Sequence, residues 1–313
     1  MTVATAPGKV ILLGEHAVVY GQPAIAVPVT QVQARAEVRD NKPGLGVTVV
    51  AADLARTFAP FRLQGESPAV LALARTVHNT LAHLGYSGEP DLLITISSTV
   101  PIGRGLGSGA AVAAALVRAL AAHLGASLTP GEVSELVYQT EMIHHGSPSG
   151  IDNAVIAFGQ PLYFVRGECA QVFAPGRPLT LLIADSGLRA ATRDVVASVR
   201  ERWQADPESY EAHFAAIGRL VRRARQAIAE GNLAELGRLM DANQEQLVAI
   251  DVSSPELDLL IAAARAAGAL GAKLSGSGRG GNMIALVEDE TQEAVRAALG
   301  AAGARSIVLT RVE

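Results

Sequence analysis

The order of apolar and polar residues predicts that the chain opens in β-structure. Val10–Leu13 is a short apolar run, and Gln31–Val38 alternates apolar with polar positions. Alternation of this kind is typical of a strand that is buried on one face. Helical spacing follows in Ala69–Leu84, and Asp91–Ser97 again has the character of a strand. The pattern therefore predicts an opening sheet, then a helix and a further strand.

A glycine-rich segment joins that strand to an alanine-rich helix, which extends to about His123. Every second residue at its centre is a glycine, namely Gly103, Gly105, Gly107 and Gly109. Such a segment lets backbone N–H groups converge on an anion, and the helix N-terminus adds a partial positive charge. A tight turn can have the same composition, so phosphate binding and a plain turn both stay open. The segment matches neither the P-loop nor the dinucleotide-binding fingerprint.

Polar residues at helix starts locate the next elements. Thr129, followed by Pro130 and Glu132, has the signature of a helix N-terminus, and the helix is expected to run to His145 with Gly146 as its stop. Asn232 with Glu235, and later Ser254 with a following proline, predict two more helix starts.

The second half of the chain alternates helices with strands. After a link rich in glycine and proline, the predicted elements are strand Leu179–Asp185, helices Ser209–Glu230, Leu233–Ile250 and Pro255–Ala267, strand Met283–Val287, helix Thr291–Leu299 and strand Ser306–Val312. This mixture predicts an α+β class and two domains, residues 1–178 and 179–313.

Composition narrows the classes of partner. The 313 residues are 49% hydrophobic and 18% charged, which allows a large buried core. The net charge is −4, and no run of basic residues suggests binding to nucleic acid or to an anionic membrane, so a small-molecule partner is favoured. One cysteine, no signal peptide and no long apolar segment lead to the expectation of a cytoplasmic protein.

A second glycine-rich stretch, Lys273–Asn282, lies far along the chain from the first. Two such loops suggest that one polyphosphate is held by both, whereas the plain alternative for the second is a flexible hairpin. The residues expected to shape the site here are Ser275, Gly276, Gly278 and Gly280.

Charged residues near the first loop could carry chemistry. Lys9 heads an apolar strand that ends at Glu15 and His16, and a buried lysine needs an anionic partner unless its ammonium reaches water. Glu141 lies on a predicted helix, and Asp152 follows a loop that could turn back towards it. A surface glutamate and a capping aspartate would have the same pattern, so both readings stay open.

Three motifs in order, Pro7–Gly21, Pro101–Ala111 and Lys273–Gly281, resemble those of the GHMP kinase family. The first motif is most similar to its form in the mevalonate kinase branch, and so are His145–Asn153 and Asp185–Gly187 with Thr192 and Arg193. The resemblance implies a two-lobed α+β fold, with an N-terminal ribosomal-protein-S5-like domain and a C-terminal ferredoxin-like domain. It also implies ATP-dependent phosphorylation of mevalonate, with Mg²⁺ as cofactor.

The resemblance assigns roles residue by residue. Asp152 would accept the proton of the substrate hydroxyl, or orient that hydroxyl, and Lys9 would stabilise charge on the oxygens. Glu141 and Ser108 would bind Mg²⁺. The nucleotide-binding residues would be Pro101, Gly103, Arg104, Gly105, Leu106, Gly107, Ser108, Gly109, Ala110 and Ala111. The substrate-binding residues would be Lys9, Glu15, His16, Tyr20, Asp152 and Thr192.

One departure from the family pattern concerns the metal. Gly109 stands where the family usually has a second serine, the one assigned to Mg²⁺. Ser108, water or the phosphates would then complete the coordination, since Mg²⁺ keeps several waters. The alternatives are a kinase for phosphomevalonate or another small hydroxy acid, and a catalytically silent protein that binds a nucleotide or metabolite. The resemblance also suggests a homodimer.

Overall fold

The computed structural model describes residues 1–145, 149–189 and 191–313, with the backbone alone at 143–145. The chain forms two compact units. Unit 1 contains residues 1–8, 32–102 and 107–159, and unit 2 contains residues 9–31, 103–106 and 160–313. The N-terminal part of the chain is therefore divided between the two units. The domain boundary expected after residue 178 stays a prediction.

Unit 1 is built on a sheet with the strand order β4-β3-β5-β2, and β1 pairs with β2. β3 and β5 are parallel, whereas β3–β4 and β2–β5 are antiparallel. The strands are β1 (Thr2–Leu13), β2 (Ala24–Asp40), β3 (Val47–Ala51), β4 (Arg56–Phe58) and β5 (Leu92–Ser98), of which β1 and β2 continue into unit 2. Two short 3₁₀ helices, η2 (Ala52–Leu54) and η3 (Pro60–Arg62), flank β4.

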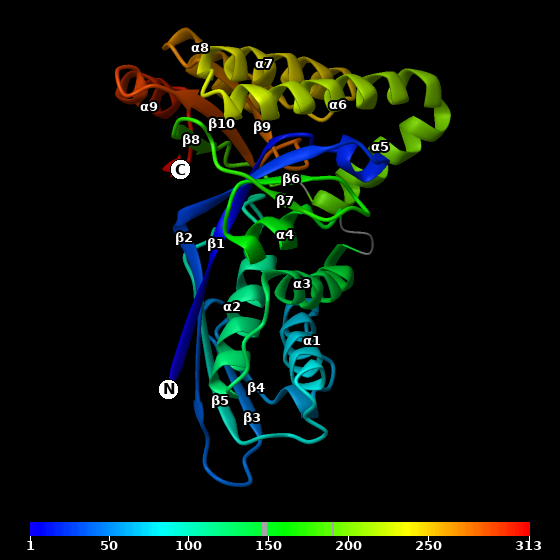
Figure 1. The fold of residues 1–313 in the computed structure, drawn as a ribbon, viewed down its shortest axis with the longest axis vertical. Coiled ribbons are helices and arrows are strands. Elements are labelled where there is room, and N and C mark those ends of the chain that lie inside the picture. The colour runs from blue at the N-terminus through cyan, green and yellow to red at the C-terminus, as the bar shows by residue number, and fades with distance from the viewer. Residues whose placement is uncertain (146–148, 190) are drawn as a thin grey trace. The chain divides into compact units, whose positions relative to one another are not determined.

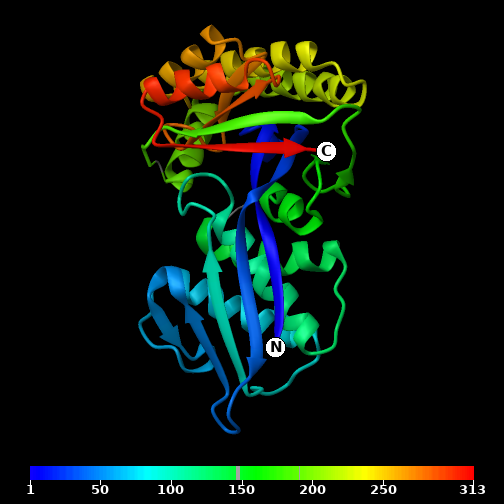
Figure 2. The same ribbon diagram turned by 90° about the vertical axis from the view of Figure 1, so that its left-hand side faces the viewer.

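The helices of unit 1 pack on one another and on one face of this sheet (Figure 1, Figure 2). They are α1 (Pro68–His83), α2 (Ser108–His123), α3 (Pro130–His145) and α4 (Ile151–Phe158). α2 is apolar on most of its surface, and its small alanines let α1 and α3 approach it closely. The predicted start of α3 is confirmed, since Glu132 accepts from the Thr129 N–H and donates its own N–H to the Thr129 hydroxyl.

Unit 2 carries a second sheet with the order β11-β8-β10-β9, antiparallel throughout. Its strands are β8 (Leu179–Asp185), β9 (Gly271–Ser275), β10 (Asn282–Val287) and β11 (Ser306–Val312). Every residue of β8, β9 and β10 is buried. The first part of β2 also pairs here with β6 (Leu162–Phe164), which in turn pairs with β7 (Gln171–Val172).

Helices α7, α8 and α9 cover one face of this second sheet, and α6 packs against α7 (Figure 1). The helices of unit 2 are η1 (Ala17–Tyr20), α5 (Thr192–Ala205), α6 (Pro207–Ala229), α7 (Leu233–Ala249), α8 (Pro255–Ala266) and α9 (Gln292–Ala301). The strand order and the helices between the strands are those of a ferredoxin-like arrangement, which confirms the expected α+β class.

The predicted helices and strands are confirmed to within about two residues at most ends. The pattern did not predict α4 or α5, nor the strands β4, β6, β7 and β9. α4 is short and follows a glycine- and serine-rich run, while α5 is mostly polar. The expected stop at Gly146 lies outside the described residues. In the part of the chain that the structure describes, no helix is both long and apolar enough to cross a membrane.

Candidate active site

The glycine-rich segment leads into α2, whose N-terminus is not capped by a side chain of the described residues. Gly107 takes the N-cap position in a left-handed conformation, with φ 72°, and among the described residues no side chain caps this end. The first N–H groups of a helix have no intrahelical partner, so they can bind an anion together with the helix dipole. Ser108, Gly109, Ala110 and Ala111 form the first turn, and the binding of phosphate there stays a prediction.

Glu141 lies against the backbone of that first turn. α3 packs on α2 and places the Glu141 side chain, which is 5% exposed, beside Gly109. A Cβ added to Gly109 would lie 3.0 Å from Glu141 Oε1, a tight approach that the neighbouring carboxylate would have to relieve by moving. The glycine that departs from the family pattern therefore leaves room for this carboxylate.

Asp152 occupies the first turn of α4, where a carboxylate interacts favourably with the helix dipole. Its side chain is half-buried. The next residue, Asn153, fixes α4 on α3 because its Nδ2 donates to the Ser134 hydroxyl at 2.8 Å and to the Ser134 carbonyl at 3.1 Å. Unit 1 thus contains Ser108, Glu141 and Asp152, three of the predicted site residues.

Lys9 belongs to unit 2, where it lies on β1 and is 3% exposed. Its backbone N–H donates to the carbonyl of Leu106 at 3.0 Å. The residues from Gly103 to Leu106 belong to the same unit, so the structure attaches the first part of the glycine-rich segment directly to the strand that carries Lys9.

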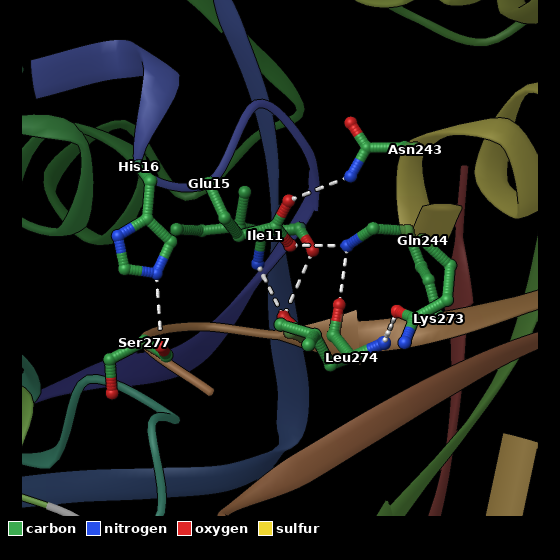
Figure 3. Close-up of polar contacts among 9 residues, drawn as sticks. Ile11, Glu15, His16, Asn243, Gln244, Lys273, Leu274 and Ser277 are labelled. Carbon is green, nitrogen blue, oxygen red and sulfur yellow. Dashed lines mark hydrogen bonds and ion pairs between the residues drawn. The ribbon is translucent and has the colours of Figure 1, made fainter. Parts of the chain in front are cut away.

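Glu15 and Lys273 form a buried ion pair, with exposed fractions of 1% and 0% (Figure 3). The Lys273 ammonium also donates to the Leu274 carbonyl, and Asn243 Nδ2 donates to the other carboxylate oxygen of Glu15 at 3.5 Å. Burial raises the pKa of Glu15 and lowers that of Lys273. The positive charge of Lys273 opposes the rise at Glu15, and the negative charge of Glu15 opposes the fall at Lys273. The predicted role of Glu15 in substrate binding stays a prediction.

His16 has a left-handed backbone, with φ 60°, and is 6% exposed. Its Nε2 lies 2.9 Å from the Ser277 carbonyl, which requires a proton on that nitrogen and a donated hydrogen bond (Figure 3). Burial lowers the pKa of His16 to about 4, the Ser277 carbonyl opposes this shift, and the positive charges of Arg279 and Lys273 add to it. The imidazole is therefore neutral at pH 7.

The lowered pKa of His16 predicts a loss of stability in mild acid. Between pH 6.5 and about 4 the unfolded chain binds a proton that the folded chain does not, so the free energy of unfolding falls as the pH is lowered, by about 3 kcal/mol in total. Comparing the unfolding midpoint over this range with that of His16→Asn checks it, because asparagine tolerates the left-handed backbone and does not titrate. Equal pH dependence of the two proteins would contradict this origin.

Tyr20 and Thr192 reach different surroundings in unit 2. The Tyr20 ring stacks on Phe214, with ring centroids 4.1 Å apart, and tilts against Trp203 at 5.2 Å. Burial raises the pKa of the Tyr20 hydroxyl. Thr192 is exposed at the start of α5, where its hydroxyl lies 3.3 Å from that of Ser277. Thr192 and His16 therefore both contact Ser277, whereas Tyr20 packs in an aromatic cluster.

The third motif begins within β9, at Lys273. Ser275 holds β1 through two hydrogen bonds, accepting from Ile11 N–H at 3.1 Å and donating to the Ile11 carbonyl at 2.9 Å. A Cβ on Gly105 would lie 3.7 Å from the Ser275 carbonyl, and one on Gly276 would lie 3.9 Å from Gly105 Cα. The two glycine-rich segments are therefore neighbours within unit 2. Gly278 and Gly280 have positive φ angles in the loop that follows.

Arg104 does not extend into solvent but forms a buried ion pair with Asp185 at the end of β8, at 2.7 Å. Its guanidinium also lies 3.4 Å from the Leu188 carbonyl, and its own carbonyl accepts from Asn282 Nδ2. The predicted contact of Arg104 with the nucleotide stays a prediction.

Sequence reasoning gave no role to Lys273, Asn243 or the side chain of Asp185. A signal was present for Lys273, because a lysine within a short apolar strand needs an anionic partner, as was argued for Lys9. For Asn243 there was no comparable signal, since it lies at an ordinary helix position. Asp185 lies in the segment Asp185–Gly187 that the family resemblance includes, but the resemblance did not indicate its ion pair. Among the described residues, no cluster of three or more His, Cys, Asp and Glu side chains could hold a metal ion.

Comparisons with known proteins agree over the whole chain. Residues 70–160 match the family model "GHMP kinases N terminal domain" and residues 224–305 match "GHMP kinases C terminal". The mevalonate kinase of Thermococcus sibiricus is 37% identical over 97% of this chain and 94% of its own length, and that of Pyrococcus furiosus is 36% identical over 94% and 92%. The crystal structure of L. major mevalonate kinase in complex with R-mevalonate is 31% identical, with a TM-score of 0.84, over 100% of this chain and 96% of the other. The chain therefore belongs to the GHMP kinase family.

Proposed function

We propose that this protein transfers the γ-phosphoryl group of ATP to the 5-hydroxyl of mevalonate, giving 5-phosphomevalonate and ADP. The observation that carries the proposal is the match to mevalonate kinases along nearly the full length of the chain, at up to 37% identity. The crystallised L. major relative holds R-mevalonate. In support, the residues that the family motifs assign to the reaction are present, with Gly109 as the departure.

The reaction forms a bond from the mevalonate oxygen to the γ-phosphorus and breaks the bond from that phosphorus to the oxygen that leaves with ADP. Asp152 accepts the proton of the attacking hydroxyl, and Lys9 stabilises negative charge on the reacting oxygens. Such a transfer depends mainly on in-line positioning and on neutralising the oxygens. Glu15, His16 and Thr192 are proposed to contact mevalonate, with Tyr20 close to the same pocket.

The N-terminal turn of α2 and the glycine-rich segment before it are proposed to bind the ATP phosphates. Uncapped N–H groups and the helix dipole supply the attraction for negative charge. The neighbouring residues of the third motif are proposed to shape the same site. GHMP kinases are ATP-dependent phosphotransferases, which agrees with this assignment.

The donors near the start of α2 fit a magnesium ion. The Glu141 carboxylate and the Ser108 hydroxyl are hard oxygen ligands, the kind that Mg²⁺ prefers, and Mg²⁺ takes its other ligands from water and phosphate. When bound, the ion would neutralise charge on the phosphate oxygens. Gly109 leaves space for the Glu141 carboxylate, so the missing family serine does not by itself argue against a metal here.

This fit predicts effects of different size for two substitutions at position 109. Gly109→Ala adds a Cβ that presses on Glu141 Oε1, so the Mg²⁺ concentration for half-maximal activity is expected to rise severalfold. Gly109→Ser adds the same Cβ together with the family hydroxyl, which is expected to recover most of the loss. Titration of activity and of bound Mn²⁺ by electron paramagnetic resonance measures both. Unchanged metal affinity in Gly109→Ala would contradict the arrangement.

Coupled ADP release tests the proposed function, with mevalonate, phosphomevalonate and homoserine as acceptors and Lys9→Met as an inactive control. Release with mevalonate and not with the others is expected. Release on phosphomevalonate alone would overturn the substrate, and no release on any acceptor would favour a silent metabolite-binding protein. A homodimer and a cytoplasmic location are also proposed. Sedimentation of the pure protein tests the homodimer.

A further inference from the structure

Arg104 is a buried residue between two exposed glycines of the first glycine-rich segment. Its two neighbours, Gly103 and Gly105, are exposed and have left-handed backbones, with φ 68° and 78°. Glycine can adopt more backbone conformations than any other residue, so the segment loses much conformational entropy when it adopts one of them. Arg104, by contrast, is 5% exposed and is held on several sides.

The anchors of Arg104 come from the neighbouring ends of two paired strands of unit 2, β8 and β10. The guanidinium donates to Asp185 Oδ1 at 2.7 Å and lies 3.4 Å from the Leu188 carbonyl, while Asn282 donates to the Arg104 carbonyl. The partner carboxylate is itself fixed, since Asp185 Oδ1 also accepts from Gly187 N–H at 2.8 Å. A buried ion pair with such further hydrogen bonds is costly to break from one side, because the other charge is left without its partner.

A second anchor follows two residues later. Leu106 is 2% exposed, and its carbonyl accepts from Lys9 N–H. Buried anchors at 104 and 106 therefore alternate with glycines at 103, 105 and 107. These anchors explain why residues 103–106 belong to unit 2 although the residues on either side belong to unit 1.

We infer that Arg104 is a positioning residue for nucleotide binding, acting through its ion pair with Asp185. The pair sets the position of the Gly105 backbone, in the glycine-rich segment that is proposed to bind the ATP phosphates. Without the pair the glycine-rich segment samples other conformations, and the nucleotide binds more weakly because it has to select the competent one. The inference rests on the proposed function, since it takes the glycine-rich segment as part of the phosphate site.

The test separates nucleotide binding from acceptor binding. In Arg104→Met, which keeps an apolar stem of similar length, the KM for ATP is expected to rise about tenfold, as expected when the competent conformation becomes a minor one. The Kd of ADP, measured by calorimetry without mevalonate, should rise by the same factor, whereas the KM for mevalonate should stay within about twofold. Asp185→Asn should act in the same direction, and Arg104→Lys should recover part of the affinity.

The matched control is Arg177→Met, which removes an arginine from an exposed ion pair with Glu288 in the same unit. It should leave ADP affinity unchanged. A lower thermal stability of Arg104→Met with unchanged ADP affinity would reduce Arg104 to a structural residue and overturn the inference, as would an equal rise in both KM values. If none of the three acceptors supports ADP release by the wild-type protein, the proposed function fails. ADP calorimetry still decides the role of Arg104 in that case.

Discussion

Replacement of Asp152 by asparagine is expected to lower the turnover number with mevalonate about a thousandfold, because asparagine cannot accept the proton of the attacking hydroxyl. Asparagine has almost the same size, and position 152 is half-buried in the first turn of α4, so the fold should be kept. The measurement is coupled ADP release with both substrates saturating. The KM for ATP should stay within about threefold, since a loss confined to the transition state appears in the turnover number.

Asp194→Asn is the matched control for this experiment. Asp194 lies in the first turn of α5 and is exposed, so it has the same relation to a helix N-terminus without an assigned role in the reaction. Its turnover number should match that of the wild type. A loss below about tenfold in Asp152→Asn would contradict proton abstraction and leave Asp152 as a residue that orients the hydroxyl.

Local signals in the sequence were sufficient for most helix boundaries. Asn232 accepts from the N–H of Glu235 at 3.0 Å, as the N-cap pattern predicted, and Ser254 caps α8 in the same way. Caps can be predicted because the residues that form the hydrogen bond lie three positions apart in the chain. The glycine-rich segment before α2 was predictable for the same reason, since the helix and its N-terminal turn are neighbours in sequence.

The partners of the buried charges could not be predicted in this way. Glu15 and Lys273 are far apart in the sequence, and so are Arg104 and Asp185, yet each pair is buried in unit 2. The chemistry of a single residue shows that a buried charge needs a partner, but the tertiary fold decides which one it is. The resemblance gave Glu15 and Arg104 roles towards ligands and gave no indication of these intramolecular pairs.

The division into units is another feature that the sequence did not reveal. Composition predicts a domain boundary after residue 178, which stays a prediction, and the compact units divide β1, β2 and the glycine-rich segment between them. A boundary within a continuous strand leaves no change in composition, because the strand needs the same apolar residues on both sides of it. Hydrogen bonds such as Lys9 N–H to Leu106 decide which unit a segment joins.

Removal of the Lys273 ammonium is expected to give the largest loss of stability. In Lys273→Met the Glu15 carboxylate stays buried without its cation, which costs about 3–5 kcal/mol and, for a chain of 313 residues, corresponds to a melting temperature lower by about 5–8 °C. Glu15→Gln should destabilise for the converse reason. Thermal unfolding followed by circular dichroism measures both, and Arg177→Met, which loses an exposed pair, should change the midpoint little.

The double variant Glu15→Gln/Lys273→Met decides whether pairing explains these losses. With both charges removed no buried charge is left alone, so the double variant should be more stable than either single one. Additive losses would contradict the pairing and point to packing instead. The same variant separates the two roles of Glu15: if this carboxylate also contacts mevalonate, as the family resemblance implies, the stability returns while the KM for mevalonate stays high.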